Sequence, residues 1–113
     1  MKLAPGVSLN GIHPEIVIGI MVMNSCYERL GFEMHLTSIC DGKHGYGSLH
    51  FCGYAADSDG IKLDGTPASV DELGDIADEM RGALTAEFDI VHGDSVHQSH
   101  IHVEYQPKYN RRA

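Results

Sequence analysis

Basic residues are scarce in this sequence, and their scarcity narrows the range of possible partners. Eight lysines and arginines stand against 16 aspartates and glutamates, which gives a formal net charge of −8. A surface that acidic repels a phosphate backbone, so we expect no nucleic-acid partner. The one cluster of basic residues, Lys108, Arg111 and Arg112, is interpreted as a solvated tail over residues 108–113.

Cysteines and long apolar runs are also sparse. The three cysteines, Cys26, Cys40 and Cys52, are an odd number without C-x-x-C spacing, which excludes complete disulfide pairing and favours reduced, partly buried thiols. The longest apolar run, residues 16–23, is far too short to span a bilayer. Glu15 precedes this run, and the residues before Cys26 fit a signal-peptide cleavage site poorly. We therefore expect a buried helix, synthesis in the cytoplasm without a signal peptide, and no membrane partner.

The remaining composition is typical of one globular domain over residues 1–113. A chain of 113 residues is long enough to bury a core, and an apolar content of 42% argues against disorder. The sequence contains no internal repeat and no low-complexity stretch.

Hydrophobic periodicity predicts two helices. The first begins at Pro14, is ended by Gly31, and repeats apolar residues at helical spacing, namely Ile16, Ile20, Met23, Tyr27 and Leu30. The second begins with a capping box between Ser69 and Glu72. Its predicted apolar face comprises Val70, Leu73, Ile76, Met80 and Leu84, and its solvent face Asp71, Asp75, Asp78 and Glu79.

Strands are predicted over residues 33–38, 54–57, 88–91 and 100–105, with a Gly- and His-rich loop over 39–49 and a turn-rich segment over 58–67. The resulting order is helix, strand, strand, helix, strand, strand. This order predicts an α+β fold in which a small, mostly antiparallel sheet packs against two main helices.

Two segments carry residues that suit a catalytic zinc site, which needs three protein ligands and an open position for water. His50 and Asp57 are close enough in sequence to bridge a loop and the strand after it. In the strand over 100–105, alternation places His100, His102 and Glu104 on one side of the sheet. The expected site is His50, Asp57 and one of the two closely spaced histidines.

The segment from Ser48 to Asp57 also resembles a known signature, Ser-x-His-x-x-Gly-x-Ala-x-Asp, through Ser48, His50, Gly53, Ala55 and Asp57. Five fixed positions would match by chance on the order of once in a few million start points. The signature is that of the zinc peptidoglycan peptidases, which include D-alanyl-D-alanine carboxypeptidases, D,D-dipeptidases and phage L-alanyl-D-glutamate endolysins. Their fold is shared with the Hedgehog signalling domain.

The likeness covers roughly residues 9 to 107. The segment over 100–105 resembles the last strand of the family, whose second histidine is the third zinc ligand, and Leu36-Thr37-Ser38 resembles the strand before the signature. The small size without a wall-binding domain resembles phage or prophage members. The resemblance therefore implies an enzyme that acts on the cell wall after release from the cytoplasm.

Carried over residue by residue, the resemblance implies one zinc ion held by His50, Asp57 and His102. It implies a zinc peptidase that hydrolyses peptidoglycan stem peptides, at a D-Ala-D-Ala or an L-Ala-D-Glu bond, with metal-activated water. His100 would stabilise the oxyanion. Gly53 and Ala55 would let the backbone bend between the first two ligands, and Ser48 would brace the loop or bind substrate.

Two departures from the family pattern leave alternatives open. Ser99 stands where the family usually has an acidic residue that transfers protons, and Asp94 and Glu104 are the two candidates for that role. The alternative role for Glu104 is to orient a ligand histidine. The family's arginine before the serine motif is also absent, so Lys43 and His44 are the candidate substrate-binding residues. The alternatives to an active peptidase are a zinc-binding module without catalysis, used for wall binding or assembly, and a metal-free structural domain.

The remaining polar candidates are given structural interpretations. His13, His35, His92 and His97 are expected to be exposed rather than ligating, and Cys52 is expected to point inward as a small apolar side chain.

Overall fold

The computed structural model describes residues 1–7, 12, 14–39, 55–93 and 98–105. Its helices and strands, in chain order, are β1 (Lys2–Leu3), α1 (Pro14–Arg29), β2 (Glu33–Ile39), β3 (Ala55–Ile61), α2 (Val70–Ala83), β4 (Phe88–Val91) and β5 (Ile101–Tyr105). The predicted order of two helices and four strands is confirmed, and the two-residue β1 was not predicted.

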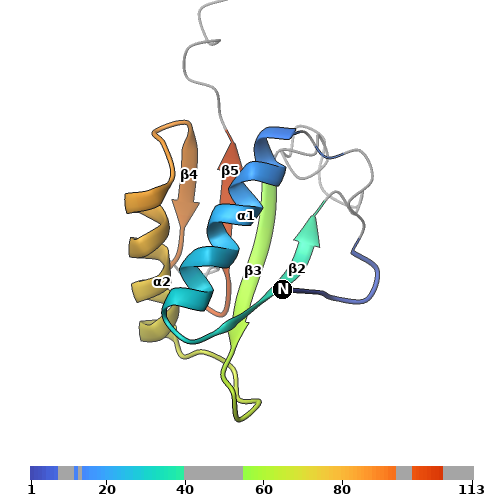
Figure 1. Cartoon of the computed structure of the whole chain (residues 1–113), viewed down its shortest axis with the longest axis vertical. Helices are drawn as coiled ribbons and strands as arrows, with labels where there is room; N and C mark the ends of the chain where they lie inside the picture. Colours follow the sequence, from blue (N-terminus) through green and yellow to red (C-terminus); the bar gives the residue numbers. More distant parts are fainter. Residues whose placement is uncertain (8–11, 13, 40–54, 94–97, 106–113) are drawn as a thin grey trace, which may run out of the picture.

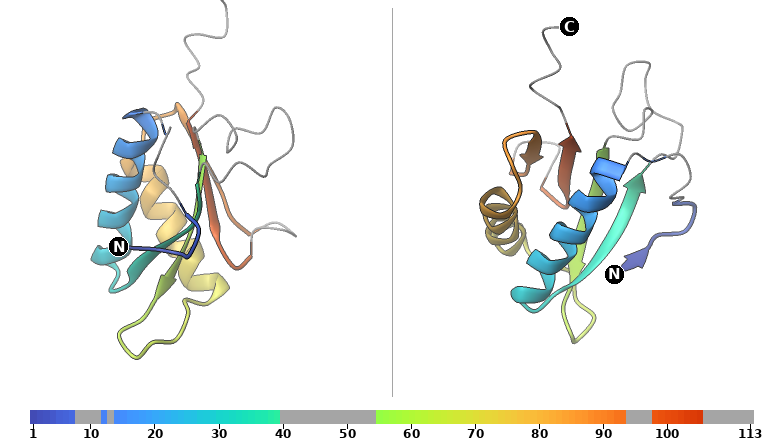
Figure 2. Two further views of the ribbon diagram at one scale, coloured as in Figure 1. Left: turned by 90° about the vertical axis from the view of Figure 1, so that its right-hand side faces the viewer. Right: turned by 45° about the horizontal axis from the view of Figure 1, so that its top comes forward.

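The five strands form one sheet in the order β1-β2-β3-β5-β4. Every neighbouring pair is antiparallel except β1 and β2. Both helices lie on the same side of this sheet (Figures 1 and 2). The predicted α+β fold, a small and mostly antiparallel sheet with two helices, is therefore confirmed. We call the side of the sheet opposite the helices the open face.

Helix α1 follows the predicted pattern closely. Pro14 is its first residue, and Gly31, with a φ of 89°, reverses the chain just after its end. The buried residues are Ile16, Gly19, Ile20, Met23, Cys26 and Tyr27. Leu30 was predicted to share this face but is 41% exposed, because the helix has already ended at Arg29.

Helix α2 begins with the predicted capping box. The Ser69 hydroxyl accepts the Glu72 amide at 3.1 Å, and the Glu72 carboxylate accepts the Ser69 amide at 2.9 Å. Leu73, Ile76 and Met80 are buried as predicted, together with Ala77, and the four acidic residues of the predicted solvent face are exposed. Val70 was expected on the buried face but is 46% exposed in the first turn.

Strand β3 is longer than the sequence predicted. The predicted strand ended at Asp57, whereas β3 continues to Ile61 through residues that favour turns. The extension is stabilised by α1, because the Tyr27 hydroxyl bonds the Ser58 hydroxyl at 2.9 Å. Gly60 lets the Tyr27 ring approach, since a Cβ at position 60 would lie 2.8 Å from Cε1 of that ring. This tertiary contact overrides the local turn preference.

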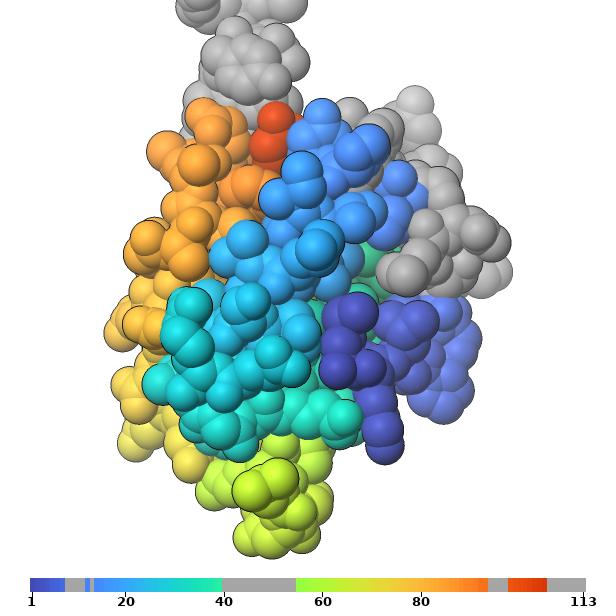
Figure 3. Space-filling view, in the orientation of Figure 1, coloured from blue at the N-terminus to red at the C-terminus, as the bar shows by residue number. Residues whose placement is uncertain are grey.

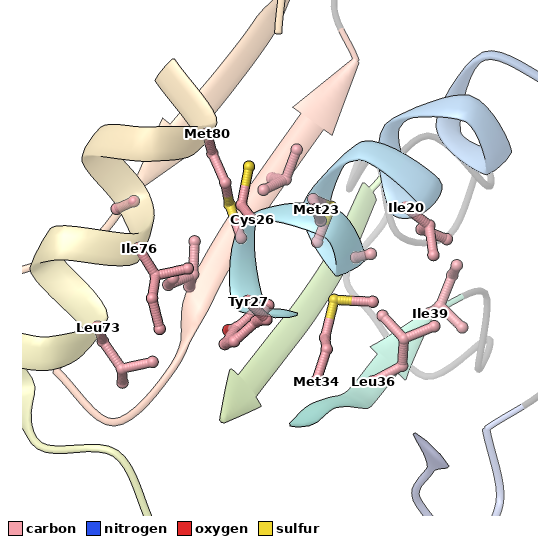
Figure 4. Packing of buried hydrophobic residues seen from close by; sticks show 14 of the residues in the cluster. Ile20, Met23, Cys26, Tyr27, Met34, Leu36, Ile39, Leu73, Ile76 and Met80 are labelled. Atoms are coloured by element: carbon pink, nitrogen blue, oxygen red, sulfur yellow. The ribbon is translucent and has the colours of Figure 1, made fainter. Parts of the chain in front are cut away.

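The hydrophobic core fills the space between the helices and the sheet. Figure 4 shows side chains from α2 and α1 meeting those of β2 in one cluster. The cluster also includes Ile101 and Val103 of β5, so the predicted alternation along this strand is confirmed. On the outer surface α1 occupies the middle of the helical side, with α2 beside it (Figure 3). Within the described ranges, neither helix has the length and apolar character needed to cross a bilayer.

Candidate metal centre

Strands β3 and β5 bring Asp57 and His102 together on the open face. The two residues are direct partners in the antiparallel register, although 45 positions separate them in sequence. Nδ1 of His102 lies 2.7 Å from Oδ1 of Asp57. Their side chains are only 12% and 19% exposed, so the pair is mostly shielded from solvent without being sealed off.

The second nitrogen of the His102 ring is also held by a carboxylate. Nε2 lies 2.7 Å from Oε1 of Glu104, two residues further along β5 on the same face. Burial lowers the pKa of His102, but the hydrogen bonds to Asp57 and Glu104 raise it by more, so the pKa lies above its ordinary value of 6.5. In the absence of metal, a protonated ring donates one hydrogen bond to each carboxylate.

His100 lies beside this pair, just before the start of β5. Its Nε2 is 3.9 Å from Oδ1 of Asp57, and its side chain is 26% exposed. That separation is too long for a hydrogen bond but short enough for a favourable charge interaction. His100 therefore stands next to the carboxylate that His102 contacts, as the alternation along the strand predicted.

Asp57 and His102 fit a zinc ion chemically. Carboxylate oxygen and imidazole nitrogen are common zinc donors. A zinc ion in place of the proton between Oδ1 of Asp57 and Nδ1 of His102 would be bound by both atoms. Glu104 would then hold the Nε2–H of His102 and fix its tautomer, as carboxylates beside metal-binding histidines commonly do. In the part of the chain that the structure describes, no three His, Cys, Asp or Glu side chains already converge on one metal position.

Five of the predicted site residues lie outside the described residues: Lys43, His44, Ser48, His50 and Asp94. The predicted zinc ligand His50, the substrate-binding residues and one candidate for proton transfer therefore remain predictions. So do the Gly- and His-rich loop after β2, the inward orientation of Cys52 and the basic tail over 108–113. Ser99, which stands where the family has an acidic residue, is exposed.

A second group of polar residues lies on the open face and was not predicted from the sequence. Asp59 follows Asp57 two positions along β3, and His35 of β2 lies directly opposite Asp59. Burial raises the pKa of Asp59, while His35 and His100 act in the opposite direction. The alternation Asp57-Ser58-Asp59 was the available signal, but the predicted strand ended at Asp57 and residues 58–67 were predicted as a turn-rich segment.

His92 was expected to be exposed and non-ligating, and the first part of that prediction is wrong. Its ring is half-buried, with Nδ1 3.1 Å from the carbonyl of His100 and Nε2 2.9 Å from the carbonyl of Val70. This imidazole links the start of α2 to the residue that precedes β5. His92 thus fixes the backbone next to the candidate site.

Comparison with known proteins adds no family assignment: no protein-family model matches the chain, and no curated protein sequence is significantly similar to it. The likeness to the zinc peptidoglycan peptidases therefore depends on the two motifs and on the pairing of Asp57 with His102.

Proposed function

We propose that this protein is a zinc-dependent peptidase that hydrolyses peptide bonds in peptidoglycan stem peptides. The observation that carries the proposal is the pairing of Asp57 with His102 at 2.7 Å on the open face. The family resemblance names these two residues, 45 positions apart, as ligands of one metal ion. A cross-strand contact between them is what that assignment requires.

Asp57, His102 and His50 are the proposed ligands. A zinc ion bound there would lower the pKa of a water molecule and polarise the peptide carbonyl. Glu104 would hold the His102 ring in one tautomer through Nε2. His100, beside Asp57, would donate a hydrogen bond to the carbonyl oxygen as that oxygen gains negative charge.

Proton transfer is assigned to Asp94 rather than to Glu104. The Glu104 carboxylate already bonds Nε2 of His102 through Oε1 at 2.7 Å, which favours a role in orienting that ring over a role as the base. This assignment predicts different effects for substitutions at the two carboxylates. Asp94→Ala should lower kcat and leave zinc affinity intact, whereas Glu104→Gln should weaken zinc binding first.

Cleavage of synthetic stem peptides tests the proposed activity. One peptide should end in D-Ala-D-Ala and another should contain L-Ala-D-Glu, with products identified by mass spectrometry after incubation with the chain loaded with one equivalent of zinc. Asp57→Asn should lower turnover at least about 100-fold, because losing a ligand does more damage than losing its supporting partner. Asp71→Asn, which removes the same charge from an exposed position on α2, is the matched control. Absence of any product from the zinc-loaded wild-type chain would falsify the activity.

A zinc-binding module without catalysis is the second candidate. It is favoured by one observation: exposed Ser99 stands where a proton-transferring carboxylate is expected. Under this alternative the chain binds zinc through Asp57 and His102 and cleaves neither peptide. Zinc affinity measured beside turnover therefore separates the two candidates.

A further inference from the structure

The carboxylate of Asp59 is an unusual feature of the open face. Its Oδ1 atom is buried and has no hydrogen-bond partner among the residues that the structure describes. A buried carboxylate oxygen without a donor or a cation costs free energy, since it has lost its water and gained nothing in return. A cation bound at such an oxygen would offset this cost.

Two imidazoles flank this carboxylate. The register of β2 and β3 places His35 directly opposite Asp59. On the other side, β5 pairs Ile101 with Ser58, and continuing that antiparallel register brings His100 next to Asp59. Both rings are close enough to act electrostatically on the carboxylate. His35 of β2, Asp59 of β3 and His100, the residue before β5, thus form a row across the sheet.

We propose that His35, Asp59 and His100 form a second metal site, which binds a zinc ion or a similar divalent transition-metal ion. Two imidazoles and one carboxylate are a donor set that such ions take readily. Asp59 lies two residues beyond Asp57, about 6.6 Å along the strand, so the site takes an ion of its own. The bound cation supplies the partner that the buried oxygen lacks.

The surroundings of His35 match those of His102. Nε2 of His35 lies 3.1 Å from Oε1 of Glu33, just as Nε2 of His102 lies 2.7 Å from Oε1 of Glu104. In each case the carboxylate stands two residues away on the same strand and the same face. A carboxylate on one ring nitrogen leaves the other nitrogen for a metal and raises its basicity. The described side chains do not converge on one point, so binding of an ion requires the His35 and His100 rings to turn toward Asp59.

Metal stoichiometry tests this site without reference to catalysis. Native mass spectrometry of the full chain, equilibrated with zinc in a volatile buffer, should find two zinc ions per chain. Asp59→Asn and His35→Gln should each bind one, and Asp71→Asn, with the same charge change on α2, should still bind two. The zinc ion that Asp59→Asn and His35→Gln retain is the one at Asp57 and His102, and its binding shows that both variants are folded. Asp57→Asn should instead lose the ion at Asp57 and His102.

Two results would overturn the second site. One is an Asp59→Asn variant that binds as many zinc ions as the wild-type chain, and the other is a His35→Gln variant that does so. Neither result depends on peptide cleavage, so the peptidase proposal can fail while this one holds. One consequence does rest on the proposed function: an ion bound through His100 takes that ring away from the oxyanion, so zinc beyond one equivalent should inhibit turnover.

Discussion

The imidazole of His102 is held from both sides, and the two contacts have different consequences. Asp57 contacts the nitrogen that would face a metal, whereas Glu104 contacts the opposite nitrogen. Replacing Asp57 removes a metal ligand. Removing the charge of Glu104 only loosens the His102 ring, which is itself a ligand. Substitution of Asp57 should therefore weaken zinc binding more than substitution of Glu104.

Glu104→Gln should weaken zinc binding about 10- to 100-fold, because the charge-assisted hydrogen bond to His102 becomes a neutral one. Competition with a chromophoric chelator measures the zinc Kd directly. Glu28→Gln, an exposed substitution on α1 with the same loss of charge, should leave the Kd unchanged. An unchanged Kd in Glu104→Gln would mean that Glu104 does not orient the ligand.

The buried hydroxyl pair of Tyr27 and Ser58 should be a strongly coupled contact. Tyr27→Phe leaves the Ser58 hydroxyl, which is fully buried, without its partner at 2.9 Å, and should cost about 1 to 3 kcal/mol of unfolding free energy. Adding Ser58→Ala removes the hydroxyl that lost its partner. The loss of unfolding free energy in the double variant should therefore be smaller than the sum of the losses in the two single variants. Urea unfolding of all four proteins measures the coupling, and strict additivity would contradict it.

At the scale of elements, α2 depends on its capping box. Ser69→Ala should destabilise the protein by about 1 kcal/mol, because the Glu72 amide loses its acceptor. The carboxylate of Glu72 accepts the Ser69 amide and also interacts with Lys62, and both contacts lower its pKa below the ordinary 4.5.

The capping box also makes a prediction about pH. Because the folded-state pKa of Glu72 is lowered, its ionised form contributes stability above pH 4.5, and this contribution is lost as the pH falls through the folded pKa. The difference in unfolding free energy between wild type and Glu72→Gln should therefore shrink on acidification. Chemical denaturation at a series of pH values measures it, and a difference that grows in acid would contradict the assignment.

The strands show which parts of the fold and site the sequence could predict. The pairing of Asp57 with His102 was predictable, because a motif and a strict alternation marked both residues. The pairing of Asp59 with His35 was not, because residues 58–61 contain the serine, aspartate and glycine that ordinarily favour turns. The strand conformation of residues 58–61 depends on β2 and on Tyr27, which are distant in sequence, and local propensity contains no information about such contacts.

At the scale of the whole molecule, zinc should act as a stabilising ligand. A metal that binds the folded chain alone adds about 2.7 kcal/mol at a free concentration of about 100 times its Kd. For a chain of this size the rise in Tm is on the order of 10 to 20 °C. Differential scanning fluorimetry with zinc and with a chelator measures the shift. Asp57→Asn should show a smaller rise than Asp71→Asn, and equal Tm values with zinc and chelator would exclude a zinc centre.

The distance in sequence between Asp57 and His102 has a consequence for biosynthesis. The two partners are 45 positions apart, and the segment between them includes the whole of α2 and β4, so no short peptide segment contains both. Closing a loop of this length is entropically unfavourable until the sheet forms. A nascent chain that has not yet released β5 from the ribosome lacks this pair altogether. Translation that stops early therefore yields a product that is unable to acquire metal through Asp57 and His102.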